Sequence, residues 1–205
     1  GISSTMLREE SQEVVKLGIV GMGRVGKRFL TEVPFVSGIR VEAAFDVETE
    51  SLKDYLKDKE GIGACADFDE LLDKSDAVYV ATPHLSHYEY CKRAILAGKH
   101  VLCETPFVLD GRQAEELYDL AKVHQVVLME ANKTAHCPAF NHLMVMIKSG
   151  VIGTVVDIEA SLSKLLPDKS LREFDPAQAG GSMFELGSYP LLPIIKLLGT
   201  DFRHV

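Results

Sequence analysis

The stretch VVKLGIVGMGRVG, residues 14–26, decides the fold. Its first half, residues 14–20, is a short apolar run that ends at a glycine, which is typical of a buried parallel strand. Its second half reads G-x-G-x-x-G, and residues 24–33 continue as a predicted helix that stops before Pro34. A strand, a glycine-rich turn and a helix in this order predict a dinucleotide-binding loop.

Each residue of the loop has an expected role. Gly21 permits the tight turn, Gly23 lets a pyrophosphate approach the backbone, and Gly26 lets the helix pack closely against the strand. The unpaired N–H groups at the start of the helix then face the phosphates. We expect all six loop residues to bind the cofactor, namely Gly21, Met22, Gly23, Arg24, Val25 and Gly26. The Arg24 side chain has two open interpretations, a cover over the pyrophosphate or adenine and a solvated arginine.

Asp46 ends the next predicted strand, residues 41–45, and lies 20 residues after Gly26. A carboxylate at this point can accept hydrogen bonds from the adenosine ribose and would repel a 2′-phosphate. The sequence therefore predicts NAD as the cofactor in preference to NADP.

Strands and helices alternate over the first 130 residues. This rhythm predicts an α/β fold with a doubly wound parallel sheet, that is, a Rossmann domain over residues 1–130. The expected strands after the first two are residues 77–81, 100–103 and 126–129, and the expected helices after the first are 51–59, 68–74, 86–97 and 111–124.

The pattern changes in residues 131–205. Residues 139–148 and 189–198 read as helices, and residues 154–165 alternate apolar with polar side chains as a half-solvated strand does. We expect the start of an α+β substrate and dimerisation domain with an open, mainly antiparallel sheet. One strand is too little for an independent sheet, so we expect this domain to be incomplete.

Composition excludes several classes. The net charge of −8 over 205 residues disfavours a nucleic-acid partner. No apolar run is long enough to cross a membrane. The four cysteines are scattered without a CxxC pair, which favours reduced thiols and a cytoplasmic protein.

A second loop, Ala81 to His87, follows the most apolar predicted strand and so emerges at the carboxyl edge of the sheet, where ligands bind. Thr82 and Pro83 are expected on the nicotinamide-ribose side. His84 and His87 are three residues apart, but no third ligand lies nearby, so we predict no metal site. Polar contacts to cofactor or substrate are the favoured roles of these two histidines.

Four segments together resemble the glucose-fructose oxidoreductase, inositol dehydrogenase and MocA family. They are residues 21–26, 81–87, 98–106 and 180–189, and residues 128–131 with Tyr189 look most like the dimeric dihydrodiol dehydrogenase branch. The resemblance implies an NAD(P)-dependent oxidoreductase of a sugar, cyclitol or related hydroxylated small molecule, and a homo-oligomer formed through the second domain. It also implies that Glu104 and Thr105 lie at the cofactor and that Thr105, Glu185 and Tyr189 are the catalytic positions.

The chain departs from the family pattern at Thr105, where the family has the lysine that shuttles the proton. A threonine hydroxyl does not titrate near neutral pH and is a poor base. Three explanations stay open: Tyr189 transfers the proton alone, Lys133 or Lys164 reaches the site, or the chain binds NAD(H) with little or no turnover. Tyr189 could equally be a half-buried packing residue.

Two further departures concern Glu185 and length. Glu185 stands where the family has aspartate, so its reach to substrate or to Tyr189 differs by one methylene. Family members continue well beyond residue 205, so we expect either a shortened chain or a sheet completed by another chain. A Rossmann domain for another nucleotide, such as S-adenosylmethionine, is a weaker alternative that the loops at 82–83 and 104–106 disfavour.

Overall fold

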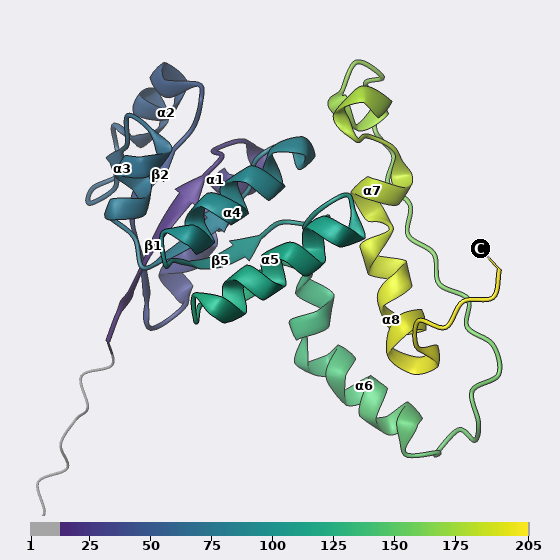
Figure 1. Cartoon of the computed structure of the whole chain (residues 1–205). Helices are drawn as coiled ribbons and strands as arrows, with labels where there is room; N and C mark the ends of the chain where they lie inside the picture. Colours follow the sequence, from purple (N-terminus) through teal and green to yellow (C-terminus); the bar gives the residue numbers. More distant parts are fainter. Residues whose placement is uncertain (1–12, 205) are drawn as a thin grey trace, which may run out of the picture. The chain divides into compact units, whose positions relative to one another are not determined.

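The computed structural model describes residues 13–204 (Figure 1). It contains a six-stranded sheet in the order β3-β2-β1-β4-β5-β6. The pairs β1–β2, β2–β3 and β5–β6 are parallel. This order reverses between β1 and β4, as in a dinucleotide-binding Rossmann sheet, and it confirms the expected fold. The strands are β1 Val15–Val20, β2 Ile39–Phe45, β3 Gly63–Ala64, β4 Ala77–Val80, β5 His100–Cys103 and β6 Leu128–Glu130.

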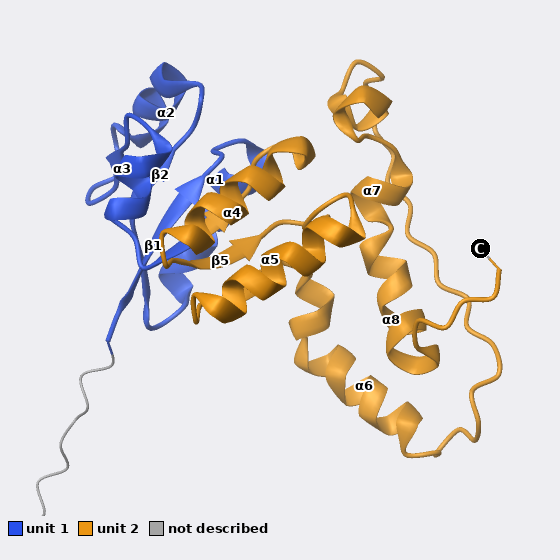
Figure 2. Ribbon diagram, in the orientation of Figure 1, with its two compact units in different colours: residues 1–78 blue, residues 79–205 orange. Residues whose placement is uncertain are grey.

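The chain divides into two compact units, residues 1–78 and residues 79–205 (Figure 2). The division falls inside β4. It does not test the expected domain boundary at residue 130, which stays a prediction. Residues 1–12 of the expected first domain lie outside the described part of the chain.

The first unit is built on β1, whose last four residues are buried. Ile19 and Ala44, on β1 and β2, have no exposed surface, and Phe68 and Leu71 of α3 are also buried. Asp67 begins α3 because its carboxylate accepts the Glu70 N–H at 2.8 Å. The helices of this unit are α1 Arg24–Glu32, α2 Thr49–Leu56 and α3 Phe68–Asp73, with a 3₁₀ turn η1 at Val33–Phe35.

The second unit has a compact part around β5 and a helical part after β6. Val101 and Cys103 of β5 are buried, as are Ile95 of α4 and Leu117 of α5. Its α-helices are α4 His87–Leu96, α5 Gly111–Val123, α6 Pro138–Lys148, α7 Ser182–Leu186 and α8 Ser188–Leu198. Its 3₁₀ turns are η2 His84–Ser86, η3 Lys133–His136, η4 Arg172–Phe174 and η5 Pro176–Gln178.

The expected strand at residues 154–165 is wrong. These residues form no strand, and Val156 is 89% exposed. Alternation of side chains defines two faces, but a strand also needs a neighbour for its backbone groups. Within residues 13–204, no other strand follows β6, so the expected open antiparallel sheet does not form in this part of the chain. Two short elements, β3 and α7, were not expected.

Candidate functional site

The glycine loop of the first unit has the geometry that a pyrophosphate requires. Gly21 has a φ of +91°, which a side chain would strain. A Cβ on Gly26 would lie 2.0 Å from the Gly21 carbonyl oxygen, so only glycine fits this contact. A Cβ on Gly23 would meet nothing within 4 Å. The loop is therefore closed where the helix packs and open where the phosphates are expected.

The N-terminus of α1 faces this opening without a side-chain cap. Gly23 is the N-cap residue and has no side chain with which to cap the helix. Arg24 and Val25 are exposed at the start of the helix, whereas Met22 is buried. The first N–H groups of a helix carry a partial positive charge, which suits a phosphate.

Asp46 lies beside the glycine loop, as predicted. Its Oδ2 accepts a hydrogen bond from the Met22 N–H at 2.6 Å, and its Oδ1 accepts one from the Glu48 N–H at 2.9 Å. These two bonds hold the carboxylate at the end of β2 with its remaining lone pairs available to a ribose.

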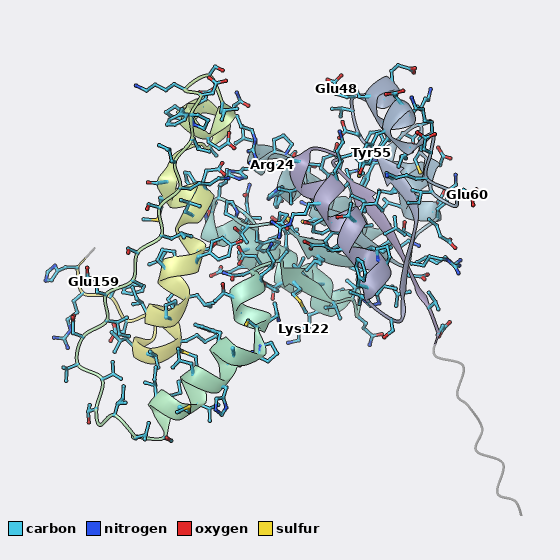
Figure 3. The ribbon with its side chains drawn as sticks, turned by 180° about the vertical axis from the view of Figure 1, so that it is seen from behind. Arg24, Glu48, Tyr55, Glu60, Lys122 and Glu159 are labelled. Atoms are coloured by element: carbon cyan, nitrogen blue, oxygen red, sulfur yellow. The ribbon has the colours of Figure 1, made fainter. Side chains whose placement is uncertain are left out.

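A hollow of about 190 Å³ adjoins this carboxylate within the first unit. Lys27 and Tyr55 form part of its wall, with the Lys27 Nζ 4.6 Å from the centre of the Tyr55 ring. Figure 3 shows Tyr55 and Glu48 on the same side of this unit. The lining residues are Met22, Gly23, Lys27, Asp46, Glu48, Ser51, Leu52 and Tyr55. Sequence reasoning missed Lys27, although it lies one helical turn after Gly23 and so on the same face of α1.

The second unit holds the residues expected to carry the chemistry. Thr82 is half-buried and Pro83 is exposed in the loop after β4. His84 and His87 are buried, and their ring nitrogens lie close to other groups of the chain, so their expected contacts with cofactor or substrate stay a prediction. The His84 Nδ1 lies 3.1 Å from the Ala179 carbonyl oxygen, and both ring nitrogens of His87 face backbone carbonyls. These neighbours could not be predicted from sequence, because most of them are backbone carbonyl groups of distant residues.

Thr105 contacts the start of α8. Its Oγ1 accepts a hydrogen bond from the Ser188 hydroxyl at 3.2 Å, and its side chain is also hydrogen-bonded to Tyr189. The preceding residue, Glu104, accepts a hydrogen bond from the Tyr79 hydroxyl, and the Thr105–Pro106 peptide bond is cis. The structure therefore brings two of the three expected catalytic residues together.

The electrostatics around Tyr189 keep its phenol protonated. Burial raises the pKa of Tyr189, and the charges of Glu104 and Glu130 raise it further, while the hydrogen bond with Thr105 acts in the opposite direction. Burial also raises the pKa of Glu130, whose Oε1 accepts the Phe107 N–H at 3.2 Å. A neutral phenol is a proton donor and a poor base at neutral pH.

Glu185, the third expected catalytic residue, lies in a separate cluster. Its Oε1 is 3.5 Å from the His84 Nε2 and 3.8 Å from the Arg172 Nη1. This Oε1 and the Arg172 Nη1 are buried and have no hydrogen-bond partner among the described residues. The two lysines considered as substitutes for Thr105, Lys133 and Lys164, are exposed.

Residues 13–204 offer neither a cluster of metal ligands nor a membrane-spanning helix. No group of three or more His, Cys, Asp or Glu side chains is arranged to hold a metal ion in this part of the chain. None of the described helices combines the length and the apolar character needed for a membrane span.

Residues 15–132 match the Gfo/Idh/MocA family, described as an oxidoreductase family with an NAD-binding Rossmann fold. The chain belongs to this family. Among Gfo/Idh/MocA relatives, the chain is 30% identical over 196 residues to scyllo-inositol 2-dehydrogenase (NADP(+)) IolU of Bacillus subtilis, covering 91% of the chain and 59% of IolU. It is 39% identical over 132 residues to D-xylose 1-dehydrogenase (NADP(+)) of Hypocrea jecorina, covering 60% of the chain and 34% of that enzyme.

A solved structure in the Gfo/Idh/MocA group has a similar fold. The crystal structure of KijD10, a 3-ketoreductase from Actinomadura kijaniata in complex with NADP and TDP-benzene, superposes with a TM-score of 0.83 and 29% sequence identity. The match covers 92% of this chain and 59% of KijD10. The chain thus spans about three fifths of the length of IolU and of KijD10.

Proposed function

We propose that this protein is an NAD(P)-dependent oxidoreductase of a sugar, a cyclitol or a related hydroxylated small molecule. The observation that carries the proposal is the cradle in the first unit, which is closed at Gly26, open at Gly23 and flanked by the Asp46 carboxylate. Family membership and the names of relatives that act on inositol and xylose support the substrate class.

The cofactor fits the residues present. The glycine loop and the start of α1 would hold the pyrophosphate, and Asp46 would hold the adenosine ribose. Since a carboxylate repels a 2′-phosphate, we propose NAD as the preferred form, although the names of several relatives specify NADP. When bound, the cofactor supplies or accepts a hydride.

Residues of the second unit are proposed to supply the proton. Reduction of a carbonyl needs a proton at the oxygen, and the Tyr189 phenol holds one at neutral pH because of its raised pKa. Thr105 and Ser188 position this phenol through their hydroxyl groups. Glu185 and Arg172 are proposed to orient substrate hydroxyls through charge-assisted hydrogen bonds. The arrangement favours reduction over oxidation, because oxidation needs a base.

The proposal is tested by titrating the protein with NADH and following the cofactor's own fluorescence, since the chain has no tryptophan. Saturable binding of NADH, and weaker binding of NADPH, is the expected result. Turnover is then measured with NADH and a panel of ketoses, inososes and aldoses. Binding without turnover would favour the alternative, a cofactor-binding protein that lost the reaction with its lysine, and absence of binding would overturn both.

We further propose that the protein is a cytoplasmic homo-oligomer that associates through its second domain. Apolar side chains are exposed on α6 and in the segment after it, including Val145, Val151, Ile152 and Val156. Contiguous exposed apolar surface is typical of an interaction site. Light scattering after size-exclusion chromatography tests the oligomeric state, and a monomeric mass would contradict it.

A further inference from the structure

The His87 ring, at the start of α4, lies between two backbone carbonyl groups. Its Nδ1 is 2.8 Å from the Pro106 carbonyl oxygen, and its Nε2 is 2.7 Å from the Thr82 carbonyl oxygen. The residue is 1% exposed. A carbonyl oxygen only accepts, so each contact is a hydrogen bond only when the nitrogen carries a proton.

A neutral imidazole carries one N–H and therefore satisfies one carbonyl at a time. The doubly protonated ring satisfies both. Burial lowers the pKa of His87, the charges of His84 and Arg172 lower it further, and the two carbonyl groups act in the opposite direction. His84 faces it from η2, with the ring centroids 5.8 Å apart, and Arg172 belongs to η4. The neutral ring therefore makes one of the two hydrogen bonds, and protonation of the ring completes the second.

The two carbonyls belong to the two loops that bear candidate site residues. Thr82 is in the loop after β4. Pro106 directly follows Thr105, whose hydroxyl contacts Ser188 and Tyr189. The His87 side chain reaches both loops, and it spans 19 residues to Pro106 and 5 to Thr82.

We propose that His87 is a positioning residue, whose ring ties the Thr82 and Pro106 carbonyls together and thereby holds Thr105 against Tyr189. This role rests on the proposed function for its effect on turnover, but the tie itself is a property of the fold. His87 touches neither cofactor nor substrate in this role. It acts through the Pro106 backbone on the Thr105 hydroxyl, which contacts the proposed proton donor, Tyr189.

The first test uses nuclear magnetic resonance of the histidine ring nitrogens in the whole chain and requires no ligand. The expected result is one slowly exchanging ring N–H at neutral pH, a second on acidification, and a midpoint below the usual value for histidine. A ring that titrates at or above that usual value, or whose N–H protons exchange at the solvent rate, would overturn the proposal.

The second test compares His87→Phe and His87→Gln with the control His124→Gln. Loss of the tie should free Thr105 from Tyr189 and raise the pKa of the Tyr189 phenol, which is followed by the resonance of its labelled ring carbon. We expect the largest shift in His87→Phe, a smaller one in His87→Gln, which keeps one donor, and none in the control. If His87→Phe does not fold, the shift of the Tyr189 pKa in His87→Gln is compared with that in the control and tests the proposal alone.

Activity provides a separate measurement. With a substrate in hand, kcat should fall on the order of tenfold in His87→Phe, within the range that proton-transfer catalysis contributes, while the Kd for NADH stays within twofold. An unchanged Tyr189 pKa and kcat would overturn the positioning role. Normal shifts of the Tyr189 pKa with no turnover in any variant would instead overturn the proposed reaction.

Discussion

Gly26 and Gly21 pack so closely that a methyl group on Gly26 would lie 2.0 Å from the Gly21 carbonyl oxygen. Gly26→Ala should therefore destabilise the protein by about 1–3 kcal/mol, the usual cost of overpacking. Urea unfolding measures the change. Gly111→Ala is the matched control, since Gly111, like Gly26, lies in the first turn of a helix and its Cβ would meet nothing within 4 Å. Equal stability of the two variants would contradict this packing.

Gly23→Ser separates cofactor binding from folding. Gly23 has an extended backbone and is the N-cap of α1, a position that serine favours, so thermal stability should be unchanged or higher. The added side chain enters the space expected for the pyrophosphate. NADH affinity should fall about tenfold or more, roughly 1.4 kcal/mol. Tight binding of NADH to this variant would place the pyrophosphate elsewhere.

Asp46→Asn tests the choice between NAD and NADP. Removal of the negative charge should reduce the preference for NADH over NADPH by about tenfold, because the repulsion of a 2′-phosphate is lost. The two dissociation constants are measured by the same fluorescence titration. Glu48→Gln is the control, since Glu48 lines the same hollow. A similar change in the control would show that Asp46 is not the discriminating group.

Thr105→Lys should restore a cation next to Tyr189. A neighbouring positive charge favours the phenolate and lowers the pKa of Tyr189. Alcohol oxidation near neutral pH should then rise by about tenfold or more, as general base catalysis becomes available. Thr105→Met, of similar length without charge, should give no gain. If neither variant changes oxidation, Thr105 does not face the reacting groups.

The two directions of the reaction should differ in pH dependence. The raised pKa of Tyr189 keeps the phenol protonated through neutral pH, so reduction should be flat there and decline only in strongly alkaline solution. Oxidation needs the phenolate, whose fraction rises tenfold per pH unit below the pKa, so its rate should climb with pH. Initial rates in both directions, with Tyr189→Phe for comparison, check this. An oxidation rate independent of pH would exclude Tyr189 as the base.

The sequence predicted those parts of the molecule that depend on local patterns. Gly21, Gly23 and Gly26 could be assigned separate roles because each role is set by the backbone of a strand-turn-helix unit. The place of Asp46 could be predicted because the length of one such unit sets where the next strand ends. The hollow beside Tyr55 could not be predicted, because it depends on how α1 and α2 pack.

Contacts between distant residues were also beyond sequence reasoning. Ser188 and Thr105 are 83 residues apart, and nothing in either segment indicates that their hydroxyl groups meet. The intramolecular contacts of His84 and His87 could not be predicted either, because a backbone carbonyl can belong to any residue type. The strand expected at 154–165 failed because a period of two specifies which side chains share a face and not which segment pairs with the backbone.

The uncapped first turn of α1 has a practical consequence for assays. Its N–H groups do not distinguish the pyrophosphate of a dinucleotide from other small oxyanions. Inorganic phosphate or sulfate in a buffer should compete with the cofactor and make its affinity look weaker than it is. Titrations in an amine or zwitterionic buffer with chloride as the anion will give the intrinsic value.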